Sequence, residues 1–371
     1  MSFEVIHHLI HFICHGTQAT RIGTDFNLNW ILLTGLGPIL ADSPCLPKET
    51  LTTDMRNALL ANELHAKVMF KQQHDALYDI LTHCQQQNLS VTLLKGQSLV
   101  SQYYPKPWFR LMRDMDLLVS SECIENLTQI LFELGYHQES QWQESYYDDH
   151  HHIMPFYHAE KGIWVEVHTR LFRLDNPLSK LECFSLESIR RETHWLTQDQ
   201  FRLGHLSAEL NLVYLCCHWA DEFKPIGGLN IFMDISYLLS RQAVDWHKIQ
   251  PWLEHPLVAV STYMVLSYLR KLGCDKISRQ QLDWIRQRHA FITAGRIKAM
   301  HYLLDQYYIA GKPANRLFSS YNLSIIWDSL IYYHNRYAIP TLIWHLIFPP
   351  SSAERYNASN VFRRLKSFFR G

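Results

Sequence analysis

Residues 91–119 hold the feature that most restricts what this chain can fold into. The segment reads VTLLKGQSLVSQYYPKPWFRLMRDMDLLV, and its second apolar run carries Asp114 and Asp116 two positions apart. Side chains alternate between the two faces of a β-strand, so both carboxylates would share one face while Met115 and Leu117 point into a core. Such a pair suits Mg2+, which binds one or two protein carboxylates and keeps its other positions for water and phosphate oxygens. A surface strand with two solvated acids would show the same pattern.

A second alternating segment supplies a third carboxylate. Residues 162–171 read GIWVEVHTRL, which places Glu166 and His168 on the face opposite Val165 and Val167. If this strand lies beside the first one, Glu166 completes a site for two metal ions. His168 would orient that carboxylate, contact a phosphate or make a structural hydrogen bond.

Basic residues flank the two apolar runs of the first segment. A helix that begins after Gly96 would offer free backbone N–H groups to a phosphate, and Lys95 would add positive charge. A strand-to-helix turn with an exposed lysine explains the same pair. Arg110 and Arg113 precede the carboxylates, either as ligands of a triphosphate or as charges that balance the acids.

The composition sets outer limits on the function. With 371 residues, 47% of them hydrophobic, the chain can form two or three domains with substantial cores. Lys plus Arg and Asp plus Glu both number 35, so the charge balance does not call for a long surface that follows a nucleic-acid backbone. The eight cysteines form no C-x-x-C pair, the N-terminus lacks the basic start of a signal peptide, and no apolar run reaches ~18 residues. The cytoplasm is therefore the expected location.

Changes of hydrophobic period predict an α+β fold in three regions. They are an N-terminal helical region (1–90), a small mixed β-sheet core (91–171) and a larger C-terminal helical domain (172–371). The expected strands are 91–94, 115–119, 152–157 and 163–168. The expected helices are 52–87, a helix from 97, 122–134, 205–221, 229–241, 256–272, 280–310 and 322–348. The basic amphipathic tail, 361–371, is expected to dock as a terminal helix rather than to bind an anionic surface.

Histidines are dense between residues 150 and 158. Neighbouring residues of a strand face opposite ways, so three consecutive histidines are not expected to share a metal ion, and a dedicated zinc site is not expected. His152 is instead a candidate for the lining of a substrate pocket.

Several motifs occur in an order shared with a known group of enzymes. They are Lys95-Gly96, Arg110 with Asp114 and Asp116, Gly135-Tyr136, Glu166 to His168 with Arg170, and then His218, Asp234 and Asp245-Trp246. Together they resemble the nucleotidyltransferase superfamily of polymerase-beta-like fold and, more narrowly, a bacterial family of uncharacterised nucleotidyltransferases. The resemblance covers roughly residues 60–250 and is loose in the C-terminal third. Most of the superfamily has Gly-Ser where this chain has Lys95-Gly96, and the gap to Asp114 is longer here; Lys-Gly is the form of the narrower family.

The resemblance implies a fold, a reaction and a set of site residues. The fold is a mixed-sheet nucleotidyltransferase core flanked by helices. The reaction moves a nucleoside monophosphate from a nucleoside triphosphate, expected to be ATP, to an acceptor hydroxyl with release of pyrophosphate. The implied catalytic residues, which would also bind two Mg2+ ions, are Asp114, Asp116 and Glu166. The implied nucleotide-binding residues are Lys95, Gly96, Ser98 and Arg110, and the implied acceptor pocket comprises His152, His168, His218 and Asp234.

Three functions remain open at this point. The balanced charge favours a small-molecule or peptide acceptor. A toxin-like or antitoxin-like enzyme that modifies RNA or a partner protein is the second possibility, and a catalytically silent nucleotide-binding scaffold is the third, disfavoured by the presence of all three carboxylates. His218 and Asp234 fit the cleft between sheet and helices as well as they fit a buried pair that joins two helices.

Overall fold

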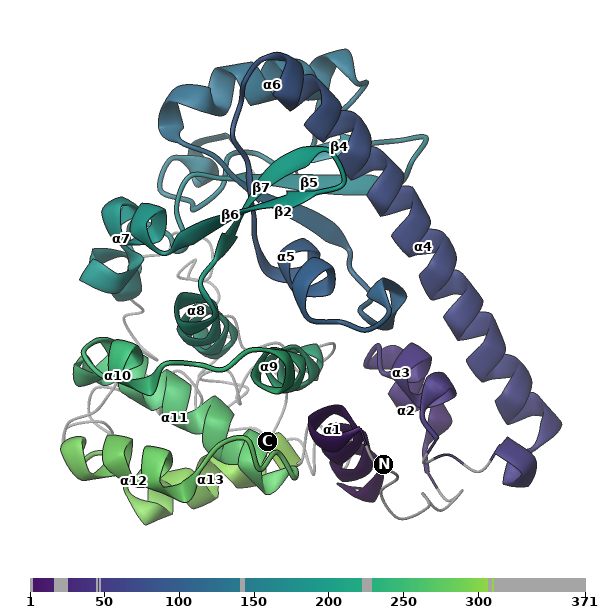
Figure 1. Ribbon diagram of the computed structural model, residues 1–371, viewed down its shortest axis with the longest axis vertical. Coiled ribbons are helices and arrows are strands. Elements are labelled where there is room, and N and C mark those ends of the chain that lie inside the picture. Colours follow the sequence, from purple (N-terminus) through teal and green to yellow (C-terminus); the bar gives the residue numbers. More distant parts are fainter. Residues whose placement is uncertain are drawn as a thin grey trace, which may run out of the picture.

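The computed structural model describes residues 3–16, 26–44, 46, 48–140, 144–221, 229–305 and 309. In this part of the chain one mixed seven-stranded sheet is covered by helices, with a larger helical assembly beside it (Figure 1). The α+β fold expected from the sequence is confirmed.

The sheet has the strand order β3-β4-β5-β2-β1-β7-β6. Its strands are β1 (Thr92–Leu93), β2 (Asp114–Leu118), β3 (His137–Gln138), β4 (Phe156–His158), β5 (Ile163–His168), β6 (Thr193–Gln198) and β7 (Phe201–Leu206). The pairs β2–β5 and β1–β7 are parallel, and the other neighbouring strands are antiparallel. The two strands that carry the carboxylates are thus direct parallel neighbours near the centre of the sheet.

Helices account for most of the remaining described residues. They are α1 (Phe3–His15), α2 (Leu28–Leu33), α3 (Gly37–Asp42), α4 (Thr53–Gln86), α5 (Lys95–Gln102), α6 (Ile124–Glu133), α7 (Leu186–Arg191), α8 (Ala208–Asp221), α9 (Asn230–Arg241), α10 (Trp246–Ile249), α11 (Pro256–Lys271), α12 (Arg279–Arg288) and α13 (Ala294–Leu304). Short 3-10 turns lie at Lys48–Thr50, Pro107–Phe109, Ser121–Cys123, Glu144–Tyr147, Pro177–Lys180, Glu182–Phe184 and Trp252–Glu254.

The long helix α4 and the shorter α6 cover one face of the sheet (Figure 1). Helix α4 starts where the Thr52 hydroxyl accepts a hydrogen bond from the Met55 amide, which satisfies one free N–H of the first turn. Met115 and Leu117 of β2, with Val165 and the other odd-numbered residues of β5, form a buried core with these helices. The even-numbered residues of β2 and β5, which include the carboxylates, consequently face the opposite side.

The opposite face of the sheet meets α5 and the helical assembly. Leu94, Leu118 and Leu206 belong to a large core shared with α8, α9 and α11. The N-terminal helix α1 packs against α9, so the first helical segment of the chain lies with the C-terminal helices (Figure 1). The carboxylate face of the sheet therefore looks toward a layer built from both ends of the described chain.

Several expected elements differ from those observed. The chain was expected to be helical beyond residue 171, but β6 and β7 form a hairpin that extends the same sheet. The helix expected at 280–310 is divided into α12 and α13, and the strand expected at 152–157 is reduced to β4 and an isolated bridge between His152 and His168. The helix expected at 322–348 and the tail 361–371 lie outside the described residues.

Membrane insertion has no support from the helices that the structure describes. None of them combines the length and the apolar character needed to cross a bilayer.

Candidate active site

Three carboxylates lie on one face of the two central parallel strands. Asp116 is the register partner of Glu166, and Asp114 is the register partner of Trp164. Because side chains two residues apart share a face, Asp114, Asp116 and Glu166 all project toward the side of the sheet that carries α5. The structure therefore brings together the three acids that the sequence assigned to catalysis.

Asp116 is the most constrained of the three acids. Its side chain is only 5% exposed, and its Oδ1 atom accepts hydrogen bonds from Lys95 Nζ and from His168 Nε2, both at 2.8 Å. His168 Nε2 also lies 3.5 Å from Glu166 Oε2. The ligand atoms of Asp116, Glu166 and His168 all lie within 4.8 Å of one another, a donor set that fits a divalent cation.

The electrostatics of the acids differ although they are close. Burial, and then the charges of Asp116 and Glu166, raise the pKa of Asp114 to about 6. Burial also acts to raise the pKa of Asp116, but the Lys95 ammonium and the hydrogen bond from His168 outweigh it and hold that pKa well below its usual range. Asp116 is therefore the permanently charged member, and Asp114 is the one that takes a proton most readily.

A backbone hydrogen bond and close packing hold the first turn of α5 beside these acids. The Leu94 amide donates to the Asp116 carbonyl oxygen at 3.0 Å, and Lys95 follows with a positive φ of 42°. A Cβ atom on Gly96 would lie 2.6 Å from Arg110 Nη1 and 2.7 Å from Met112 Sδ, so no larger residue fits without displacing these side chains. The close packing sets the backbone of this turn against the strand that carries Asp116.

Arg110 and Asp234 form a buried ion pair between the sheet region and α9. Arg110 Nε and Nη2 donate to the two Asp234 carboxylate oxygens at 2.8 and 3.1 Å, and the Tyr104 hydroxyl donates to Oδ1 at 2.5 Å. Asp234 is only 1% exposed. The structure thus brings together one predicted nucleotide-binding residue and one predicted acceptor-pocket residue, as partners of each other.

His218, the other predicted acceptor residue on the helices, stacks on Tyr214 with ring centroids 5.5 Å apart. The buried pair that joins the elements is therefore Arg110–Asp234 rather than His218–Asp234.

Ser98, a predicted nucleotide-binding residue, is buried on α5. Its hydroxyl makes a 3.0 Å hydrogen bond with His205 Nδ1 and accepts another from Gln102 Nε2 at 3.0 Å. Burial lowers the pKa of His205 to about 4, so its ring is neutral at pH 7 and shares a hydrogen bond with the Ser98 hydroxyl. This contact attaches α5 to β7.

The neutral His205 predicts a pH dependence of stability. Because its pKa falls from about 6.5 in the unfolded chain to about 4 in the fold, the free energy of unfolding should decrease as the pH drops below 6.5, by about 3 kcal/mol at pH 4 from this residue. In His205→Asn, which keeps an acceptor for Ser98, urea unfolding at a series of pH values should show a flatter dependence. Identical profiles for the two proteins would contradict this assignment.

The three histidines of residues 150–152 converge, contrary to the expectation from strand geometry. Their candidate ligand atoms lie within 4.8 Å of one another, since only His152 takes part in a β-bridge and the preceding residues follow a turn. His152 Nδ1 donates to the Ile153 carbonyl at 2.7 Å, and its Nε2 lies 3.7 Å from Glu166 Oε2. His152, a predicted residue of the acceptor pocket, therefore lies close to Glu166.

One basic residue that follows Glu166 in the sequence was not assigned a site role from the sequence. Arg170 Nη1 is buried and has no hydrogen-bond partner in the described part of the chain. Its place in the Glu166, His168, Arg170 motif is the signal that could have marked it, although β5 itself ends at His168. Arg113 is exposed directly before Asp114.

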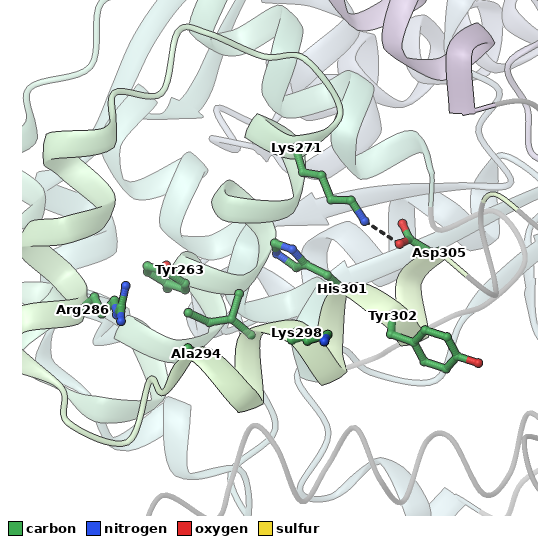
Figure 2. A pocket seen from close by; sticks show the side chains of 9 residues that line it. Tyr263, Lys271, Arg286, Ala294, Lys298, His301, Tyr302 and Asp305 are labelled. Atoms are coloured by element: carbon green, nitrogen blue, oxygen red, sulfur yellow. Dashed lines mark hydrogen bonds and ion pairs between the residues drawn. The ribbon is translucent and has the colours of Figure 1, made fainter.

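A separate hollow of about 570 Å3 lies among α11, α12 and α13. Figure 2 shows Lys271 reaching toward Asp305, its ion-pair partner, with His301 beside them. The lining residues are Tyr263, Lys271, Arg286, Ala294, Ile297, Lys298, His301, Tyr302 and Asp305. The site residues predicted from the sequence take no part in this lining.

Comparison with known proteins agrees with the geometry. No curated protein matches the chain. The model of a family described as uncharacterised nucleotidyltransferase matches residues 25–273, a span that includes the whole sheet, the carboxylates and the Arg110–Asp234 pair. Since this span is more than half of the chain, the protein belongs to that nucleotidyltransferase family.

Proposed function

We propose that the protein transfers a nucleoside monophosphate from a nucleoside triphosphate, with ATP as the first candidate, to a hydroxyl group of a small molecule or peptide. The observation that carries this proposal is the convergence of Asp114, Asp116 and Glu166 on one face of β2 and β5, beside Lys95 and the start of α5. Membership of a nucleotidyltransferase family supports the reaction type.

The acids would hold two divalent cations, and Mg2+ is the expected ion. Strand β2 would supply two of the carboxylates and β5 the third. Asp114 and Asp116 would hold both ions, one on the triphosphate and one at the attacking hydroxyl, and Glu166, the register partner of Asp116, would complete the second site. Bound cations neutralise charge on the phosphates and lower the pKa of the attacking hydroxyl. The pairing of adjacent strands fixes the three carboxylates before substrate arrives, which is the preorganisation such charge stabilisation requires.

The phosphates need cations from the protein as well. Lys95 is close enough to exchange its contact with Asp116 for a phosphate oxygen, and Arg113 and Arg170 are the proposed additional contacts. Arg110 is proposed to act indirectly, because Asp234 already occupies the Nε–Nη2 edge of its guanidinium. Its packing against Gly96 would keep the α5 backbone in place for the nucleotide.

The proposed reaction balances as a single displacement. The acceptor oxygen forms a bond to the α-phosphorus, the bond from that phosphorus to the bridging oxygen breaks, and pyrophosphate leaves. The hydroxyl proton passes to a carboxylate of the site. His152, His168 and His218 are proposed to line the acceptor side.

The acceptor can be identified directly. Purified protein incubated with each α-32P-labelled nucleoside triphosphate, Mg2+ and a cell extract should place the label in a small-molecule fraction. EDTA should abolish this labelling. Label in RNA or in a protein band would support the toxin-like or antitoxin-like alternative, and nucleotide binding without any transfer would support the scaffold.

The cytoplasm is the proposed compartment, in keeping with the free thiols of all seven cysteines that the structure describes.

A further inference from the structure

The cation position between Asp116 and Glu166 is bordered by nitrogen as well as oxygen. His168 is fully buried on β5, and its Nε2 lies 2.8 Å from Asp116 Oδ1 and 3.5 Å from Glu166 Oε2. An imidazole enclosed between two carboxylates can either donate a proton to them or share a metal ion with them.

His152 approaches the same position from the neighbouring segment. Since its Nδ1 donates to the Ile153 carbonyl at 2.7 Å, the neutral ring must carry its lone pair on Nε2. That nitrogen lies 3.7 Å from Glu166 Oε2. A backbone carbonyl that fixes the tautomer of a histidine is the usual outer partner of a metal-binding imidazole.

The spacings suit ligands of one ion. Metal–nitrogen and metal–oxygen bonds of about 2.0–2.2 Å place neighbouring ligand atoms roughly 3–3.5 Å apart. The separations of 2.8 and 3.5 Å from His168 Nε2 to Asp116 and Glu166 fall near this value, and His152 Nε2 adjoins the set at 3.7 Å from Glu166 Oε2. The β-bridge between His152 and His168 holds the two imidazoles at a fixed separation, with ring centroids 5.4 Å apart.

We propose that this position binds a first-row transition-metal cation of the Mn2+ or Zn2+ class through Asp116, Glu166, His168 Nε2 and His152 Nε2, in preference to Mg2+. The inference rests on the proposed function and refines it, because it names the kind of cation for the Glu166 side of the site. Mg2+ binds oxygen ligands almost exclusively, whereas first-row cations from Mn2+ to Zn2+ accept imidazole nitrogen beside carboxylate oxygen, Zn2+ more strongly than Mn2+. Ligation requires a lone pair on His168 Nε2, so the neutral ring would carry its proton on Nδ1.

Pulsed electron paramagnetic resonance of Mn2+ bound to the full-length protein tests this ligand set. The spectrum should show coupling to a coordinated nitrogen, and the coupling should change when the histidines carry 15N. His168→Asn, which removes Nε2, should lose most of this coupling and weaken Mn2+ binding at least about tenfold while changing Mg2+ binding much less. His152→Asn retains a donor for the Ile153 carbonyl and should cause a smaller loss of the same kind.

A variant of the adjacent histidines provides the matched control. The double variant His150→Asn, His151→Asn should keep the nitrogen coupling, since neither residue is among the four proposed ligands. Coupling that disappears in this control, or an oxygen-only spectrum of the wild-type protein, would overturn the proposal. The isotope-labelled wild-type protein decides the question even if a variant fails to fold.

The inference and the proposed function can fail separately. If the α-32P label is transferred in the presence of Mg2+ and the Mn2+ spectrum shows only oxygen ligands, the proposed function stands and the proposed histidine ligands are wrong. If nitrogen coupling is present but no nucleoside triphosphate supports transfer, the metal site stands and the nucleotidyl transfer is wrong.

Discussion

Asp116→Asn should reduce nucleotidyl transfer by about a thousandfold or more, which is the largest effect on activity expected for a single change here. Asp116 is the carboxylate contacted by both Lys95 and His168, and its register partner is Glu166. The amide keeps the shape of the side chain but removes the charge that would hold a cation. Pyrophosphate release at saturating nucleotide and metal measures the loss.

Two controls separate chemistry from folding in this experiment. Glu160→Gln changes an exposed carboxylate in the turn between β4 and β5 and should retain wild-type turnover. Circular dichroism and urea unfolding should show that Asp116→Asn remains folded. Turnover within tenfold of the wild-type rate in the folded variant would remove Asp116 from the mechanism.

Asp234→Ala should lower the free energy of unfolding by about 3–5 kcal/mol, the largest stability effect expected from a single change. The change leaves the Arg110 guanidinium buried without its partner and removes the acceptor of the Tyr104 hydroxyl. Arg110 also packs against Gly96, so the variant should lose activity through a displaced α5 even where it stays folded. Urea unfolding followed by tryptophan fluorescence measures the stability change.

An exposed pair and a double variant make this prediction specific. Asp42→Ala breaks a half-exposed ion pair with Lys106 and should cost no more than about 1 kcal/mol. Arg110→Met combined with Asp234→Leu removes both buried charges and should recover part of the lost stability. A loss below 1 kcal/mol for Asp234→Ala would show that the buried pair is not a structural link between the sheet and α9.

Local patterns were sufficient to predict the central elements. The apolar spacing after Thr52 predicts α4, and alternation over Asp114–Leu117 and over β5 predicts the two carboxylate strands, because each of these signals depends only on neighbouring residues. The C-terminal end of α6 was also predictable, since Gly135 takes the positive φ of 86° that ends a helix.

Other features escape such patterns for physical reasons. The β6–β7 hairpin turns at Asp199 with a positive φ of 53°, and Gln200 follows where a glycine would have given the usual hairpin signal. Strand β6 is at the edge of the sheet and largely exposed, so it shows no alternation of buried and exposed positions. The pairing of Arg110 with Asp234 joins residues 124 positions apart, and no local spacing encodes it.

The candidate site was predictable to a similar degree. Alternation placed Asp114 and Asp116 on one face, but the adjacency of Glu166 depends on the parallel pairing of β2 with β5, which only the family resemblance suggested. The convergence of His150 and His151 with His152 was missed, because the rule for strands was applied to a segment that forms a turn.

Separate labelling of the α- and γ-phosphates of the nucleotide tests the central claim most directly. With wild-type protein, divalent cation and an acceptor fraction, the α-32P label should move to the acceptor and the γ-32P label should be recovered in pyrophosphate. Added EDTA should reduce the amounts of both labelled products in parallel. Transfer of the γ-32P label to the acceptor, with release of the nucleoside diphosphate, would contradict nucleotidyl transfer at the three carboxylates.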